Sequence, residues 1–265
     1  MDCIISAGGV PQEGDLLYEY THGRPKALIN IAGKPMVQWV IDALTEAQKI
    51  EHIILVGLNP EDGIRSPKLT ATLPDQGSLV ENLIVGAELA LKQNPQAPHA
   101  VFCTADIPTI TGDMIDELIE QCDDPDVQIY YTAVEKSTME KRFPGSHRSY
   151  VHAIEGDLAG GDIHIGDPRL VNTKRELMDD LLRNRKSALK QIRKIGLGLF
   201  LKLLFRRLSL KEAEIRISKA LDLKGKAIIV RHAELGMDID KPLQLQICQR
   251  MLEEQYTCKS EDLNA

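Results

Sequence analysis

The sequence predicts an α/β protein built around a mainly parallel β-sheet. Short apolar runs of strand length alternate with longer stretches whose apolar residues have helical spacing. This alternation is typical of βαβ units, in which consecutive strands run parallel. The chain has 265 residues, of which 43% are hydrophobic, enough to bury the core that such a sheet requires.

The first half of the chain supplies four expected strands and three expected helices. The strands are residues 3–6, 52–56, 100–104 and 127–134. The helices between them are residues 36–47, 79–91 and 113–121. In the first helix, apolar residues at 36, 37, 40, 41 and 44 share one face. Ligands of parallel sheets bind at the carboxyl ends of the strands, so the loops that follow these strands are the candidate site.

The second half of the chain is less regular. Residues 150–155 and 162–165 are expected strands on either side of a glycine pair, 227–230 is a further strand, and 242–254 is a closing helix. Residues 174–207 have a helical pattern and are basic, with eleven lysines and arginines against three acids. We therefore expect a single domain over 1–265 with a basic and apolar helical insertion at about 173–222.

Two interpretations of this insertion remain open. Its apolar residues are too few in a row to span a bilayer. An amphipathic helix most often packs its apolar face on its own protein or on a second subunit. A basic amphipathic helix can also lie on anionic lipid, which would give a peripheral membrane contact.

Composition excludes several classes of function. The net charge of −7 and the 4% aromatic content disfavour a nucleic-acid-binding protein. The five cysteines form no C-x-x-C motif and are typical of a reducing compartment. The first residues, MDCIISAGG, lack the basic region and long apolar run of a signal peptide. We therefore expect a cytoplasmic protein.

A glycine pair follows the first expected strand, and a lysine comes soon afterwards. Gly8 and Gly9 would allow backbone N–H groups to approach phosphates closely, and Lys26 could neutralise phosphate charge. The alternative is a tight turn followed by a surface lysine. The motif matches neither of the common dinucleotide-binding and phosphate-loop patterns, so it does not decide between the two by itself.

Carboxylates follow two other expected strands. Asp106 lies in the run CTADIP, just after the expected strand 100–104, while Asp238 and Asp240 lie in GMDIDKP before the closing helix. Because a parallel sheet brings such strand ends together, these acids could share one Mg²⁺, which prefers oxygen ligands. Helix or turn capping is the alternative for each of them.

Taken together, these motifs resemble the nucleotidyltransferase superfamily, in particular the molybdenum-cofactor-guanylyltransferase-like NTP transferases, which are related to sugar-1-phosphate nucleotidyltransferases. The resemblance rests on AGG, RPKAL and GKPMV near the start, on the D-x-P at Asp106 and on GMDIDKP. It implies a Rossmann-like three-layer sandwich of the nucleotide-diphospho-sugar transferase type, with a mainly parallel sheet, plus the helical insertion.

The resemblance also implies roles for individual residues. Lys26 and Asp106 would be catalytic, and Asp106 and Asp240 would bind the metal, with Asp240 preferred over Asp238. The residues implied to bind the nucleotide are Ala7, Gly8, Gly9, Arg24, Lys26, Gly77, Ser78 and Asn82. The family usually carries an arginine shortly after the glycines; this chain does not, and Arg24 is expected in its place.

Two further segments have alternatives that stay open. Ser78 and Glu81 also fit a capping box at the start of a helix, which competes with a role beside the nucleobase. Gly160, Gly161 and Asp162 resemble the segment that lines the acceptor site. His147, Arg148 and His152 lie nearby in sequence, and each could touch an acceptor phosphate or be structural.

The expected function is a Mg²⁺-dependent transfer of NMP from an NTP to a phosphorylated small-molecule or lipid-linked acceptor, with release of pyrophosphate. One alternative is a glycosyltransferase that uses a nucleotide-sugar donor. Another is a non-catalytic membrane-surface protein on the same fold. Neither the nucleotide, the acceptor nor the oligomeric state is readable from the sequence.

Overall fold

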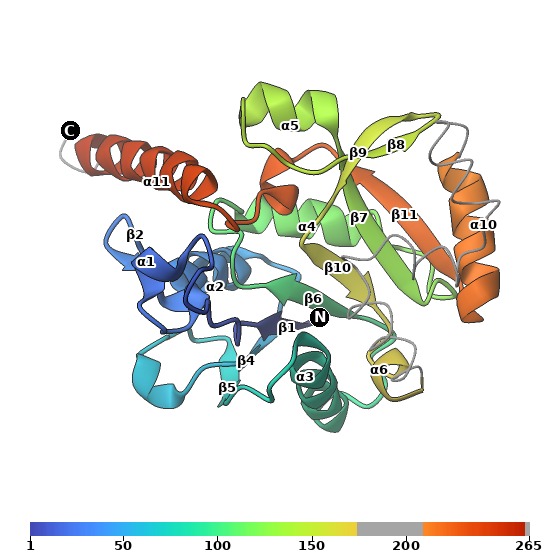
Figure 1. Ribbon diagram of the computed structural model, residues 1–265. Coiled ribbons are helices and arrows are strands. Elements are labelled where there is room, and N and C mark those ends of the chain that lie inside the picture. The colour runs from blue at the N-terminus through green and yellow to red at the C-terminus, as the bar shows by residue number, and fades with distance from the viewer. Residues whose placement is uncertain (174–208, 263–265) are drawn as a thin grey trace.

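The computed structural model describes residues 1–173 and 209–262. A nine-stranded sheet runs through these residues in the order β5-β4-β1-β6-β10-β7-β9-β8, and β11 pairs with β7 (Figure 1). The strands are β1 (Asp2–Ser6), β4 (His52–Val56), β5 (Leu69–Leu73), β6 (Ala100–Thr104), β7 (Ile129–Glu135), β8 (Val151–Ala153), β9 (Gly156–Gly160), β10 (Ile163–Gly166) and β11 (Gly225–Val230). A separate small hairpin joins β2 (Asn30–Ile31) to β3 (Lys34–Pro35).

Most of the sheet is parallel, as expected. β1 runs parallel to both β4 and β6, β4 runs parallel to β5, and β7 runs parallel to β11. Two parts of the sheet are antiparallel. β10 lies between β6 and β7 and is antiparallel to both, and β9 is antiparallel to both β7 and β8. The carboxyl ends of β1, β4 and β6 therefore meet at one edge, where the site residues are expected.

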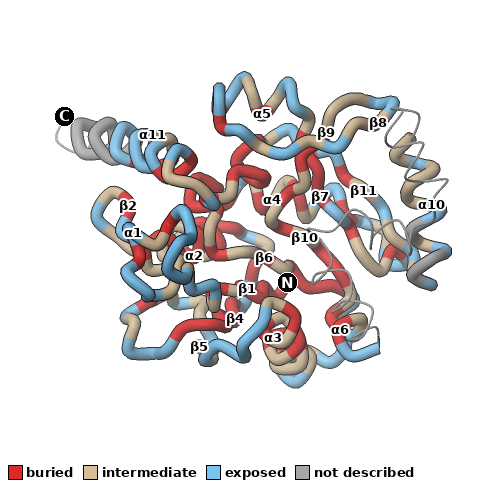
Figure 2. The backbone as a smooth tube through the Cα atoms, viewed as in Figure 1, coloured by how far each residue is buried: buried red, intermediate tan, exposed pale blue. Residues whose placement is uncertain are grey.

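Helices cover both faces of the sheet, which confirms the three-layer α/β architecture. The helices are α1 (Tyr18–Thr21), α2 (Met36–Glu46), α3 (Leu79–Gln93), α4 (Gly112–Glu120), α5 (Lys136–Arg142), α6 (Leu170–Thr173), α10 (Leu210–Leu221) and α11 (Pro242–Asp262). Side chains of α2 and α4 pack in the main core with Cys3 and Ile5 of β1. Ile4 points to the other face and packs with α3. Figure 2 shows these strands as the most continuously buried part of the chain.

Several elements were not anticipated from the sequence. The helix α5 and the strand β9 lack a clear apolar period, and β9 includes the glycine that was expected to interrupt a strand. The edge strand β5 alternates apolar residues with threonines, but this run, LTATL, is short and only partly buried. Their pairing partners lie elsewhere in the chain, since β5 pairs with β4 and β9 with β7 and β8. Backbone hydrogen bonds to these neighbouring strands stabilise β5 and β9.

The expected insertion is only partly covered by the described residues. Residues 174–208 lie outside them, so the single-domain organisation and the insertion at about 173–222 stay predictions. Within that range, α10 is helical and packs on β11. Among the helices of 1–173 and 209–262, none combines the length and apolar character needed to cross a bilayer.

Candidate active site

The glycine turn after β1 is closely packed against two neighbouring loops. The Ala7 N–H donates to the Val56 carbonyl oxygen at 2.7 Å. A Cβ on Gly8 would lie 2.0 Å from Asp75 Oδ1, and one on Gly57 would lie 2.1 Å from the Gly8 nitrogen. A side chain at Gly8 or Gly57 would collide with these neighbours. Glycine at both positions therefore allows the loops that contain Gly8, Gly57 and Asp75 to pack closely together. Gly9, in contrast, faces open space.

Lys26 connects this turn to the carboxylates. It begins the short 3₁₀ helix η1 (Lys26–Leu28), and its N–H donates to the Gly9 carbonyl oxygen at 2.8 Å. Its Nζ lies 2.5 Å from Asp106 Oδ2 and 3.0 Å from Asp240 Oδ1. Burial alone would favour the neutral amine, but the charges and hydrogen bonds of these two aspartates outweigh it and raise the pKa of Lys26. The lysine is therefore a fixed positive charge.

Three carboxylates from two distant segments converge beside Lys26. Asp106 follows β6, whereas Asp238 and Asp240 follow β11 and the short helix η3 (Ala233–Gly236). One oxygen from each of the three lies within 4.8 Å of the others. The Ile239 N–H donates to the Asp106 carbonyl oxygen at 3.0 Å, so a backbone hydrogen bond joins the two segments. The structure thus brings together the acids that the sequence placed at separate strand ends.

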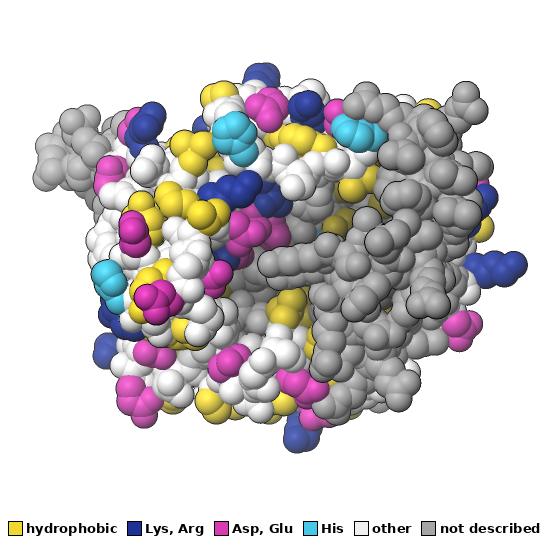
Figure 3. Space-filling view, viewed as in Figure 1, with side chains coloured by type: hydrophobic (Ala, Val, Ile, Leu, Met, Phe, Trp, Pro, Cys, Tyr) yellow, Lys and Arg dark blue, Asp and Glu magenta, His cyan; other side chains and the backbone are white. Residues whose placement is uncertain are grey.

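A fourth aspartate and an arginine complete the cluster. Arg148 forms ion pairs with Asp238 and, at 3.3 Å, with Asp162. Asp162 lies between β9 and β10, where its carbonyl oxygen accepts a hydrogen bond from the Thr104 N–H at 3.0 Å. Burial and the nearby charge of Asp106 raise the pKa of Asp162 to about 7, and Arg148 opposes this shift. Figure 3 shows acidic and basic side chains side by side near the middle of this face.

The donor set fits a divalent cation with a preference for oxygen ligands. Asp106 Oδ1 is buried and has no hydrogen-bond partner within 1–173 and 209–262. Such an oxygen is costly unless something binds it. When all are ionised, the four aspartates outnumber Lys26 and Arg148 by two charges, which is the charge of one Mg²⁺.

The residues expected beside the nucleobase form a loop that packs against the glycine turn. The Asn82 amide donates to Asp75 Oδ1 at 2.8 Å and accepts from the Gln76 N–H at 2.8 Å. Ser78 Oγ accepts from the Glu81 N–H at 3.2 Å and caps α3. Capping and loop support are thus present. They do not exclude base binding, since an amide nitrogen has a second proton to donate.

The remaining expected residues lie in two places. Gly77 has open space around its Cα, and Arg24 is exposed two residues before Lys26. Gly160 and Gly161 lead into Asp162, and a Cβ on Gly161 would lie 2.1 Å from Thr132 Oγ1. The glycine pair therefore lets the chain cross closely over β7.

The structure places two further residues in the cluster. Asp238 is the acid to which Asp240 is preferred as a metal ligand, and Arg148 is one of three basic residues considered for contact with an acceptor phosphate. The D-x-D spacing of GMDIDKP was the available signal for Asp238, because residues two apart in an extended segment point to the same side and can both reach one site. No local signal distinguishes Arg148 from neighbouring basic residues.

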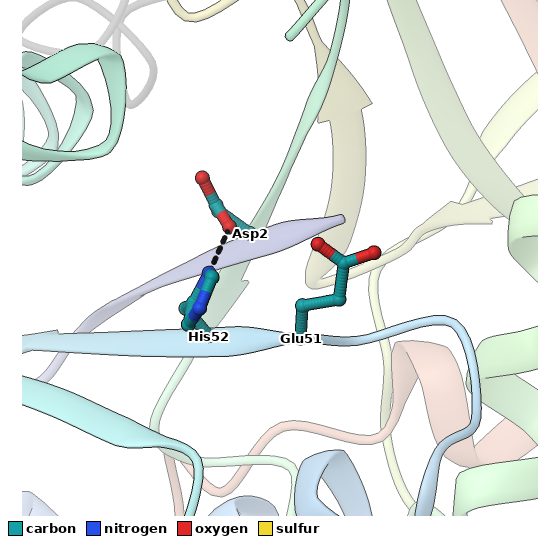
Figure 4. A group of neighbouring side chains, drawn as sticks. All are labelled: Asp2, Glu51 and His52. Atoms are coloured by element: carbon teal, nitrogen blue, oxygen red, sulfur yellow. Dashed lines mark hydrogen bonds and ion pairs between the residues drawn. The ribbon is translucent and has the colours of Figure 1, made fainter. Parts of the chain in front are cut away.

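Figure 4 shows a second group of ionisable side chains, Asp2, Glu51 and His52. Asp2 Oδ1 lies 2.9 Å from His52 Nδ1, and the amino group of Met1 lies 3.5 Å from Glu51 Oε1. Asp2 and His52 are paired residues at the amino ends of β1 and β4, away from the glycine turn. Asp2 is only 1% exposed, so we interpret the pair as compensation for a buried carboxylate.

Comparison with known proteins defines the class of enzyme first. A hypothetical transferase from Thermus thermophilus superposes with a TM-score of 0.79 at 33% identity, over 92% of this chain and 98% of that one. CMP:2-keto-3-deoxy-manno-octonic acid synthetase in complex with CTP shares the fold, with a TM-score of 0.59 at 14% identity over 96% of this chain and 100% of that one. The chain is an enzyme of the nucleotidyltransferase class.

The family follows from the sequence itself. The MobA-like NTP transferase domain matches residues 5–193, and the chain belongs to this family. A curated relative is the bifunctional protein GlmU of Thermoanaerobacter pseudethanolicus, which is 29% identical over 97 residues, or 36% of this chain. The matched part spans about a fifth (21%) of that relative's length.

Proposed function

We propose that this enzyme transfers a nucleoside monophosphate from an NTP to a phosphorylated acceptor, with bound Mg²⁺ and release of pyrophosphate. The single observation that carries the proposal is the meeting of Lys26 with Asp106 and Asp240, beside the glycine turn. Charge from three distant segments is concentrated at the edge of the sheet where ligands of this architecture bind.

The glycine turn is the proposed triphosphate site. Ala7, Gly8 and Gly9 form this turn at the end of β1. The Ala7 N–H is used by the Val56 carbonyl, so Gly8 and Gly9 are proposed to donate to the phosphates, and a Cβ on Gly9 would meet no described atom within 4 Å. The hydrogen bond from Lys26 to the Gly9 carbonyl holds the ammonium close to that turn. Arg24, which is exposed nearby, is proposed to reach the outer phosphates in place of the missing loop arginine.

Asp106 and Asp240 are the proposed ligands of Mg²⁺, with Asp238 beside them. The unpartnered Asp106 Oδ1 and the spacing of the three carboxylates support this assignment. The chemistry that a bound Mg²⁺ supplies is the neutralisation of charge on the phosphates. Asp240 is 61% exposed at its side chain, so it can adjust to an incoming ligand more easily than Asp106, which is 14% exposed.

The proposed reaction is an in-line displacement at the α-phosphorus. An oxygen of the acceptor phosphate forms a bond to this phosphorus, the bond to the bridging oxygen breaks, and pyrophosphate leaves with the electron pair. An acceptor phosphate is already an anion at neutral pH, so no general base is required. The contribution of the protein is positioning and charge stabilisation, with Lys26 as the fixed cation.

The base and the acceptor are assigned to opposite sides of the cluster. Gly77, Ser78 and Asn82 are proposed to lie beside the nucleobase, because their loop packs on the glycine turn. Gly160, Gly161 and Asp162 are proposed to line the acceptor site. The acceptor can be a phosphorylated small molecule or a lipid-linked phosphate, and the second would suit a peripheral membrane contact by residues 174–207.

A reducing cytoplasm is the proposed location. Cys3, Cys103, Cys122 and Cys248 are free, buried thiols. Burial raises the pKa of Cys122 and of Cys248 to about 12, so both stay protonated and unreactive at neutral pH.

The first test is a pyrophosphate-release assay. Each of the four NTPs is combined with Mg²⁺ and a panel of phosphorylated acceptors, with a nucleotide sugar as a separate donor. We expect one NTP to release pyrophosphate only when an acceptor is present. Asp106→Asn should reduce the rate roughly 100-fold or more, because a metal ligand contributes several kcal/mol of charge stabilisation.

Asp113→Asn is the matched control for this substitution. Asp113 is an exposed carboxylate in the first turn of α4, which also follows β6, and it lies outside the cluster. Its loss should leave the rate within about twofold. Full turnover by Asp106→Asn would overturn the metal assignment, and turnover of the nucleotide sugar instead of an NTP would favour a glycosyltransferase.

A further inference from the structure

Arg148 occupies a position that the proposed reaction does not yet explain. It lies in the loop between α5 and β8, and its side chain is only 13% exposed. Its guanidinium donates to the Gly160 carbonyl and to Asp162, each at 3.3 Å, and forms an ion pair with Asp238. One side chain therefore joins the segment before β10 to the segment before α11.

We propose that Arg148 is a positioning residue that divides the four aspartates of the site. It holds Asp162 and Asp238, and it leaves Asp106 and Asp240 to Lys26 and the metal ion. This inference rests on the proposed function, since it concerns the way in which the metal ligands are selected.

The contacts of the cluster support this division. Lys26 contacts Asp106 and Asp240, and Arg148 contacts Asp162 and Asp238, so each cation has its own pair of acids. Yet Asp238 is close enough to share an ion with Asp106 and Asp240. Its contact with Arg148 is the feature that distinguishes it from the other two.

The type of side chain matters as well as its charge. A guanidinium is planar and offers several N–H donors in fixed directions, so it can bind two carboxylates and a carbonyl oxygen at once. A lysine ammonium has the same charge but binds as a single point. Lysine at this position would keep the electrostatic balance of the cluster and lose the fixed spacing between Asp162 and Asp238.

Removing the positive charge of Arg148 would have a different effect from replacing its guanidinium by an ammonium. Without Arg148, Asp238 would lose its ion pair and could turn toward any cation shared with Asp106 and Asp240. A unit positive charge would also be removed from within several ångströms of the metal position. Both changes strengthen the binding of a divalent cation and weaken the control of its position.

The experiment measures metal binding and turnover separately. Metal-free full-length protein is titrated with Mn²⁺ while free Mn²⁺ is followed by electron paramagnetic resonance, and pyrophosphate release is measured with Mg²⁺. For Arg148→Met we expect Mn²⁺ affinity to rise about tenfold or more and turnover to fall about tenfold or more. For Arg148→Lys we expect Mn²⁺ affinity within twofold of wild type and the same loss of turnover.

Arg216→Met is the matched control. Arg216 forms an ion pair with Glu212 one helical turn away on α10, outside the cluster. It should change neither measurement, and a thermal melt of each variant checks that it is folded.

The outcomes separate this inference from the proposed function. If wild-type protein binds Mn²⁺ and turns over while Arg148→Met matches it in both, Arg148 is not a positioning residue. Should Arg148→Met fail to fold, Arg148→Lys decides, because wild-type turnover by that variant would also end the inference. Wild-type protein that neither binds Mn²⁺ nor releases pyrophosphate would overturn the proposed function itself.

Discussion

At the scale of single residues, the absence of a side chain at Gly8 is as important for the shape of the site as the charged residues are. Gly8 lies against Asp75 and Asn82, which are hydrogen-bonded to each other at 2.8 Å. Any Cβ at this position would separate that pair, because it would lie 2.0 Å from Asp75 Oδ1 and 2.7 Å from the Asn82 amide nitrogen. The loop proposed to hold the nucleobase would then move away from the turn proposed to hold the phosphates.

We therefore expect Gly8→Ala to raise the KM for the NTP roughly tenfold. Loss of the Asp75–Asn82 hydrogen bond should also lower the free energy of unfolding by about 1 kcal/mol. Steady-state kinetics and urea denaturation measure the two effects. Gly9→Ala is the control for stability, since its Cβ would meet no protein atom within 4 Å and should leave the free energy of unfolding unchanged. An equal loss of stability in the two variants would contradict this account.

At the scale of elements, the antiparallel strand β10 contributes a partly buried histidine, His164. The Thr132 N–H of β7 donates to His164 Nδ1 at 3.2 Å, and the imidazole stacks on Tyr131 with a centroid distance of 4.6 Å. Nδ1 must therefore accept a hydrogen bond, which requires the neutral ring. Burial lowers the pKa of His164 from 6.5 to about 4.

This shift predicts a pH dependence of stability. The unfolded chain binds a proton at His164 below about pH 6.5 and the folded protein does not, so stability is complete above that pH and falls as the pH drops toward 4. Between pH 7 and pH 5 the loss should be roughly 1–2 kcal/mol. Urea denaturation at both pH values should show a smaller loss for His164→Gln, whose carbonyl oxygen can accept the same hydrogen bond.

The control for this prediction is a histidine outside the sheet. His22 is exposed at the end of α1, and His22→Gln should keep the wild-type difference between the two pH values. If His164→Gln loses as much stability as wild type on acidification, the protonation of other groups explains the effect.

At the scale of the whole molecule, the site is assembled from segments spread over most of the described chain. Lys26 comes from the segment after the first strand, and Asp106 and Asp162 lie at the same end of the antiparallel β6–β10 pairing, just after β6 and just before β10. Asp238 and Asp240 follow β11 in the chain, and their position therefore depends on the pairing of β11 with β7. Binding at the cluster should therefore stabilise the whole fold.

A thermal-shift experiment tests this coupling. The carboxylates and the triphosphate repel each other unless a cation lies between them, so NTP alone should have little effect in the presence of EDTA. With Mg²⁺, a saturating NTP should raise the Tm by about 5–10 °C. Asp106→Asn should abolish most of that rise, whereas an equal rise in EDTA would show that nucleotide binding is independent of metal.

Much of the fold class was predictable from the sequence because it depends on local periodicity. The strands at residues 3–6, 52–56 and 100–104 and the helices between them repeat apolar residues at the spacing that each element needs. The closing helix was also predicted, although α11 extends further than expected. The strands β5 and β9 were not predicted. β9 has few apolar residues and becomes a strand where neighbouring strands offer backbone partners, whereas the alternating run of β5 is only five residues long.

The sequence alone determined the α/β class and the candidate residues near each strand end. Those properties depend on residues a few positions apart. Only the tertiary structure decided that Lys26 lies between Asp106 and Asp240, and that Arg148 joins Asp162 to Asp238. The physical reason is that these contacts depend on strand order and on the antiparallel placement of β10. Both are set by packing across the whole sheet rather than by any local pattern.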